Sequence, residues 1–114
     1  LSGYSGESGF VTIGGNFACD HNSGGCFAGG RIVRGNVQVD HNSNSSGGPA
    51  AEVSGNNVGG NVLVDSNSGS SATEVGNNTI GGNLQCAGNT PGVTDAPFGP
   101  NNVSGTKQGQ CAGL

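Results

Sequence analysis

The sequence predicts an all-β fold: a parallel β-helix (β-solenoid) of about five rungs of 20–25 residues with Gly/Asn/Ser corners. Gly, Asn and Ser supply 53 of the 114 residues. This disfavours helices, because Gly costs about 1 kcal/mol per helical position and Asn and Ser prefer caps and turns. An eleven-residue segment recurs along the chain, which is typical of a solenoid. Within it, apolar and polar residues alternate as in a strand with one buried face.

Four copies of the segment align without gaps, beginning at residues 13, 33, 58 and 80, and a degenerate fifth begins near 103. One such strand cannot bury its apolar face alone, whereas stacked copies can, with like residues in columns. We therefore expect a single domain over residues 1–114. The expected core residues are Ile13, Val33, Val58, Ile80, Phe17, Val37, Val62, Leu84, Val39 and Val64.

Each rung needs corners between its short strands. Gly at the second and third positions of the copies is expected to allow bends with positive φ. Asn tolerates the left-handed region and bonds locally. We expect amide ladders, in which each side chain bonds to the one above at the ~4.8 Å strand spacing. One ladder comprises Asn16, Asn36, Asn61 and Asn83, and the other Asn22, Asn42, Asn67 and Asn89.

Four cysteines allow three disulfide pairings. Their spacings of seven and twenty-five residues do not fit zinc ligation. Cys19 and Cys86 share a column but lie three rungs apart, about 14 Å, which exceeds the ~7 Å reach of a disulfide. The pairs Cys19–Cys111 and Cys26–Cys86 are also too distant. Cys19–Cys26 and Cys86–Cys111 remain, and disulfides in a short polar chain predict secretion. A start at Leu1 rather than Met is expected of a chain whose leader has been removed.

The last third of the chain carries a more specific pattern. It contains Ile80–Pro91, a Pro-containing loop, the stretch Asn102-Val-Ser-Gly and the stretch Gly109–Leu114. Over residues 80–114 the chain resembles Gly/Asn-rich, disulfide-containing secreted proteins of actinobacteria with β-helix-type repeats, a family largely of unknown function. The resemblance implies secretion and supports the Cys86–Cys111 pair, and it adds no chemistry.

The most suggestive group for chemistry is a column of three Asp with two His beside it: Asp20, Asp40, Asp65, His21 and His41. Stacked carboxylates repel, which raises their pKa or attracts a cation such as Ca²⁺. Calcium-binding β-rolls place Asp two positions earlier in their repeat, and Ala87 interrupts the column here. Asp at corners is also ordinary turn chemistry. We therefore expect no metal or other cofactor, and the Asp column is the candidate for Ca²⁺.

Other functional classes find little support. Glu52 and Glu74 repeat in register, which indicates structure, and no acid/base constellation of a polysaccharide-cleaving enzyme is recognisable. We predict a protein that is not an enzyme. Three cations leave no electrostatic footprint for nucleic acid. No apolar run approaches the ~20 residues of a membrane span.

The remaining prediction concerns the ends of the stack, where unprotected strand edges pair with other chains. We expect a secreted structural protein that stacks head to tail, through 4–15 at one end and 101–114 at the other, into an extracellular filament or surface layer. The expected assembly residues are Tyr4, Phe10, Val103 and Leu114. The alternative is a module that binds a glycan or cell-surface partner through the corner loops 44–51, 66–72 and 91–100.

Overall fold

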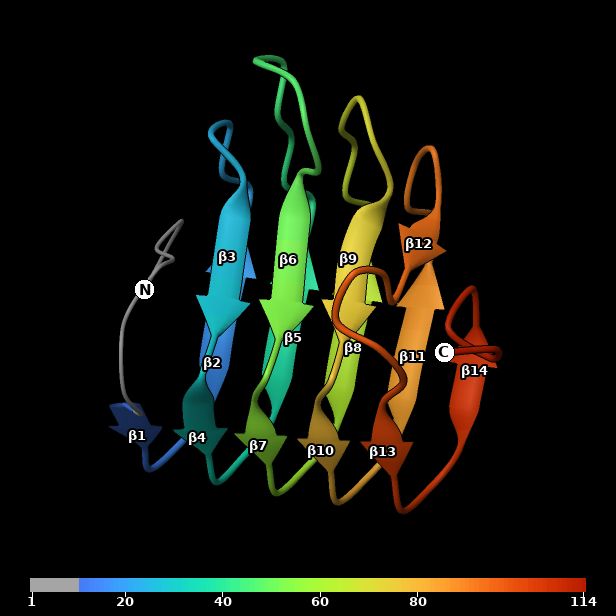
Figure 1. Cartoon of the computed structure of the whole chain (residues 1–114). Helices are drawn as coiled ribbons and strands as arrows, with labels where there is room; N and C mark the ends of the chain where they lie inside the picture. Colours follow the sequence, from blue (N-terminus) through green and yellow to red (C-terminus); the bar gives the residue numbers. More distant parts are fainter. Residues whose placement is uncertain (1–10) are drawn as a thin grey trace.

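The structure, a computed structural model, describes residues 11–114, which form short strands and no helix. The strands build three parallel sheets (Figure 1). The first sheet contains β1 (Val11–Ile13), β4 (Arg31–Val33), β7 (Asn57–Val58), β10 (Thr79–Ile80) and β13 (Asn102–Val103). The second contains β2 (Phe17–Asp20), β5 (Val37–Asp40), β8 (Val62–Asp65), β11 (Leu84–Ala87) and β14 (Lys107–Gly109). The third contains β3 (Cys26–Gly29), β6 (Ala51–Ser54), β9 (Thr73–Gly76) and β12 (Val93–Thr94).

The chain visits the three sheets in turn, so the predicted β-solenoid is confirmed. Within residues 11–114 there are four three-stranded rungs and a fifth with β13 and β14 only. The register places like residues above one another, as the repeat predicts: Val37 lies beside Val62, and Val62 beside Leu84. In Figure 1 the loops between the second and third sheets project from one edge of the stack.

The predicted core columns lie in the interior. Nine of the ten predicted residues are buried, and Ile13 in the first rung is partly buried against them. The sequence reasoning missed the contribution of the third sheet, in which Ala28, Val53 and Val75 are buried. These residues lie outside the eleven-residue repeat. The shorter repeat Glu-Val at 52–53 and 74–75 was the available signal.

The expectation of positive φ at the repeated Gly positions is wrong. Gly60 and its equivalents at the corner between the first and second sheets do not adopt left-handed backbone angles. They are needed for close stacking instead: a Cβ at Gly60 would run into Asn36 Oδ1 and the Gly35 carbonyl of the previous rung. The same collision would occur at Gly35, Gly82 and Gly105.

Left-handed residues turn the chain at the end of each strand of the second sheet. His21, His41 and Ser66 have φ of 58°, 57° and 57°, and Gly88 in the fourth rung has φ of 66°. This region is uncommon for residues other than Gly, although His and Asn tolerate it better than most. Each of these residues is followed directly by an Asn. The bend therefore recurs at one corner whatever the side chain that makes it.

Both predicted disulfides are present. Cys19–Cys26 joins β2 to β3 with a Cα–Cα distance of 6.3 Å, and Cys86–Cys111 joins β11 to the turn after β14 with a Cα–Cα distance of 5.3 Å. All four cysteines are buried. By the entropy of loop closure, such bonds contribute about 2 kcal/mol for the short loop and about 3 kcal/mol for the longer one. They fasten the first and last rungs.

Candidate functional site: the ends and corners of the stack

The first inner ladder runs through the buried corner between the second and third sheets and comprises Asn22, Asn42, Asn67 and Asn89. Asn67 illustrates its bonding. Its Oδ1 accepts from the backbone N and Nδ2 of Asn42 at 3.1 and 2.9 Å. Its Nδ2 donates to the Val39 carbonyl at 3.1 Å and to Asn89 Oδ1 at 2.9 Å. The predicted ladder is confirmed. Its amides hydrogen-bond backbone N–H and C=O groups that would otherwise have no partner in this buried corner.

A second inner ladder, which the sequence reasoning missed, comprises Asn56, Asn78 and Asn101 at the corner between the third and first sheets. Asn78 Oδ1 accepts from both nitrogens of Asn56 at 3.0 Å. Asn78 Nδ2 donates to the Val53 carbonyl and to Asn101 Oδ1, each at 2.8 Å. The two echoes of Glu-Val followed by Asn-Asn carried the signal for this ladder.

The outer ladder comprises Asn16, Asn36, Asn61 and Asn83, and it differs from the prediction in its bonding. The side chains are exposed. Each Oδ1 accepts from a backbone N–H of the next rung, as when Asn61 Oδ1 accepts from Asn83 N at 2.8 Å. No amide-to-amide bond joins these side chains within the part of the chain that the structure describes. The expected column is present, but it supports the backbone of the Gly corner.

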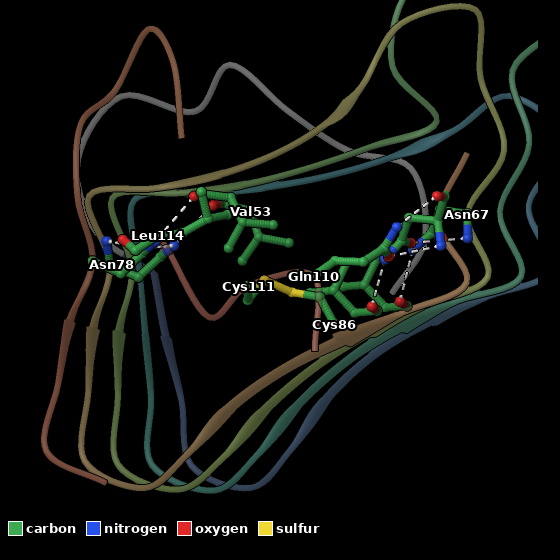
Figure 2. The surroundings of a disulfide bond; sticks show 12 residues. Val53, Asn67, Asn78, Cys86, Gln110, Cys111 and Leu114 are labelled. Atoms are coloured by element: carbon green, nitrogen blue, oxygen red, sulfur yellow. Dashed lines mark hydrogen bonds between the residues drawn. A yellow bond between two sulfur atoms is a disulfide. The ribbon is translucent and has the colours of Figure 1, made fainter. Parts of the chain in front are cut away.

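The last residues close the interior at the C-terminal end of the stack. Gln110 Oε1 accepts from Asn89 N and Nδ2 at 2.9 and 3.0 Å, and Gln110 Nε2 returns a bond to the Asn89 carbonyl at 2.9 Å. The Leu114 carbonyl accepts from Asn101 N at 2.8 Å. Figure 2 shows the Cys86–Cys111 disulfide between these two groups. Residues 110–114 thus form a cap, the C-terminal cap, that the sequence reasoning did not find.

Two of the four predicted assembly residues lie in the part of the chain that the structure describes. Tyr4 and Phe10 lie outside the described residues. Val103 and Leu114 are partly buried and pack against the core. At the level of strands, β1, β2 and β3 edge the three sheets at one end, and β13, β14 and β12 edge the same sheets at the other. Among the described residues no strand pairs with the outer sides of these edges.

The Asp column forms as predicted on the outside of the second sheet, where Asp20 pairs in register with Asp40 and Asp40 with Asp65. Burial raises the pKa of Asp65, while a hydrogen bond from the Ala87 backbone opposes the rise and the nearby Asp40 carboxylate adds to it. The repulsion expected between stacked carboxylates thus acts in the predicted direction on the pKa of Asp65, but burial is the larger cause. Beside the column, the imidazole rings of His21 and His41 stack with centroids 4.7 Å apart.

A second pair of like charges lies on the third sheet, where Glu52 of β6 and Glu74 of β9 are aligned. Burial raises the pKa of Glu74, and the neighbouring Glu52 carboxylate raises it further. Ser54 Oγ donates to Glu52 Oε2 at 3.1 Å. The two Glu side chains are therefore consistent with a structural role, as their repetition in the sequence indicates.

Two of the three predicted loops come together. Residues 43–45 and 68–70, which are Ser, Asn and Gly, line an open pocket of about 330 Å³. Gly48 N donates to Ser70 Oγ at 2.6 Å, which ties the two loops to each other. The loop 91–100 does not line this pocket. Its distal part lies beside the corner that follows β9, where the Gly99 carbonyl accepts from Asn77 N at 3.0 Å.

Comparisons with known proteins add no family to these observations. No family model matches the chain, and no curated protein or solved structure is significantly similar to it. The described residues contain no helix long and apolar enough to cross a membrane. Two disulfides fit an extracellular protein, because such bonds persist in oxidising compartments.

Proposed function

We propose that this chain is a secreted, non-enzymatic structural protein that stacks end to end into an extracellular filament or layer. The observation that carries the proposal is that, within residues 11–114, each of the three parallel sheets ends in an edge strand at both ends of the stack. Strand edges present unpaired backbone groups, which are templates for pairing with another chain.

The geometry of the two ends suits a head-to-tail contact. All described strand pairings between rungs are parallel. A second copy placed beyond β13 and β14 would therefore present its β1 and β2 in the orientation of the next rung. A contact between two different surfaces does not close on itself, so repetition makes an open fibre. The C-terminal cap closes the interior of the last rung, so the contact would rest on the sheet edges.

The edge at β1 gives the proposal a specific test. The Ile13 carbonyl accepts from Arg34 N at 3.0 Å, so the N–H and C=O of Ile13 face β4. The same groups of Thr12 face the opposite side, because successive residues of a strand alternate. Thr12→Pro removes a donor from the outer edge without breaking a described bond to β4.

Sedimentation velocity and negative-stain images across a concentration series provide the measurement. Wild-type protein should form oligomers or fibres, and Thr12→Pro should stay smaller. Gln85→Lys is the matched control, because Gln85 is exposed on the face of β11, away from any edge, and should not alter assembly. Wild-type particles that remain monomers of 11.0 kDa at high concentration would reject the proposal.

A second candidate function is binding of a neutral glycan at the pocket between residues 43–45 and 68–70. Four Ser and one Asn are among its six lining residues, and their hydroxyl and amide groups can hydrogen-bond polyols without a charged partner. A glycan array probed with the wild type and with a variant shortened in loop 44–51 tests this function. A signal that the shortened loop abolishes would support it, and an array without signal would count against it.

A further inference from the structure

We propose that Asp20, His21 and His41 bind one divalent transition-metal ion of the zinc type on the first two rungs. Each residue offers one ligand atom, and these atoms lie within 4.8 Å of one another. All three side chains are exposed, with relative accessibilities of 51%, 70% and 52% for Asp20, His21 and His41.

The backbone brings the two imidazoles together. His21 and His41 occupy the same left-handed position in adjacent rungs, and their rings stack at 4.7 Å with planes 2° apart. The bend itself does not require imidazole, because Ser66 and Gly88 hold the same backbone conformation in the next two rungs. The pair is thus confined to one place on the stack, and it would hold a single ion and not an array.

Asp20 Oδ1 contacts His21 Nδ1, so these two atoms can face one ion together. Asp40 has a different role, because its Oδ2 lies 3.4 Å from His41 Nδ1. A carboxylate at Nδ1 favours the tautomer whose Nε2 lone pair is free for a metal, an arrangement common in metal sites. Asp40 is itself held by Gln38, whose Nε2 donates to Asp40 Oδ2 at 3.1 Å. Asp40 is therefore a positioning residue for His41.

The donor set selects the class of ion. Two imidazoles and one carboxylate suit Zn²⁺, Cu²⁺ or Ni²⁺, whereas Ca²⁺ takes oxygen ligands only. Zinc binds nitrogen and oxygen at about 2.0–2.2 Å. The ligand atoms must therefore approach one another by roughly 1 Å, within the rotation of exposed side chains. Water completes the coordination shell, as in sites with three protein ligands.

Isothermal titration at neutral pH with ZnCl₂, and separately with CaCl₂, tests the site on the intact, disulfide-bonded chain. We expect one Zn²⁺ per chain, no saturable Ca²⁺ binding, and a shift of the His21 and His41 ring signals in NMR. His21→Ser and His41→Ser should abolish the saturable zinc heat. Both variants should fold, because Ser66 adopts the same φ one rung further on. Asp40→Asn should weaken zinc binding by roughly ten- to a hundredfold through the orientation of His41.

Asp65→Asn is the matched control, because it removes a charge from the same column and keeps the Asp65 carbonyl that accepts from His41 N. It should leave zinc binding unchanged. Three results would overturn the proposal. The first is the absence of saturable zinc binding. The second is an equal loss of zinc binding in Asp65→Asn and His21→Ser, which would indicate diffuse attraction of the ion to the Asp column. The third is a stoichiometry of one ion per two chains.

Discussion

The inner ladders and the outer ladder use the same residue at the same rung spacing, but they differ in what their amides do. Asn67 in the first inner ladder is fully buried, and its side chain takes part in four hydrogen bonds to Asn42, Val39 and Asn89. Asn61 in the outer ladder is exposed, and its Oδ1 accepts one backbone N–H. The hydrogen bonding of a ladder therefore depends on whether its side chains are buried as much as on the repeat that aligns them.

The local backbone explains the difference. In the first inner ladder each Asn follows a left-handed residue, such as Ser66 before Asn67, which turns the chain so that the amide points inward. In the outer ladder each Asn follows a Gly, and from the second rung onward that Gly must lie close to the previous rung, such as Gly60 before Asn61. Removing an inner amide leaves buried hydrogen-bonding groups without a partner, whereas removing an outer amide leaves a backbone N–H that water can reach.

The largest effect is expected from Asn67→Ala. The change leaves the backbone N and Nδ2 of Asn42 without their acceptor in a buried corner. We expect the free energy of unfolding to fall by about 3 kcal/mol or more, because each stranded buried group costs about 1–3 kcal/mol. Urea denaturation followed by circular dichroism measures this loss. Asn78→Ala in the second inner ladder should behave alike, and a loss below 1 kcal/mol in both would contradict the distinction.

The Gly corner should give the next largest effect. Gly60→Ala places a Cβ against Asn36 Oδ1 and the Gly35 carbonyl, and we expect a loss of about 2 kcal/mol from overpacking. The matched control is Gly15→Ala in the first rung, where a Cβ meets no described atom within 4 Å. Equal melting temperatures for the two variants would show that stacking distance does not select Gly here.

Asn61→Ala should have a smaller effect. The Asn83 N–H that loses its acceptor lies at an exposed corner and can bond to water instead. We expect a loss of about 0.5–1 kcal/mol, the net value of one hydrogen bond. The same urea titration provides the measurement, and a loss as large as that of Asn67→Ala would erase the difference between the ladders.

The smallest effect on the free energy of unfolding is expected where two carboxylates, Glu52 and Glu74, stack between rungs in place of amides. The pKa of Glu74 is raised above its ordinary value of 4.5, so between these two pKa values the native state binds more protons than the unfolded state. The free energy of unfolding therefore falls as pH rises through that window.

Glu74→Gln should remove this fall. The variant should gain about 0.5 kcal/mol or less at neutral pH, because the side chain is partly exposed and solvent screens the repulsion. Below the ordinary Glu pKa the contribution of this ionisation disappears. Unfolding titrations at several pH values test the sign, and a variant less stable than the wild type at neutral pH but not at acid pH would reverse it.

Sequence reasoning succeeded where a pattern recurred in several copies. The columns from Phe17 to Leu84 and from Asn22 to Asn89 follow from the aligned segments. Both disulfides follow from distance along the stack. Stacking of His21 on His41 follows the same register, although the ring geometry depends on the left-handed backbone.

Sequence reasoning missed features that occur in few copies and features whose cause lies elsewhere in the structure. The third sheet follows loops of unequal length, so Val53 and Val75 do not align with the main repeat without a gap. Gln110 closes the first inner ladder only once, and its residue type differs from the Asn that it continues. The reason for Gly60 lies in an atom of the neighbouring rung, which no local propensity encodes.

The register between rungs has a consequence for length. Residues 57–78 span one complete turn, from β7 to the end of the corner after β9. Their removal would join Asn56 to Thr79, so that β4, β5 and β6 would meet β10, β11 and β12, and Asn42 would meet Asn89. The core columns of the first two sheets and the first inner ladder would find like partners. In a protein whose energy is summed over neighbouring repeats, whole turns are units that can be lost or duplicated without a new fold.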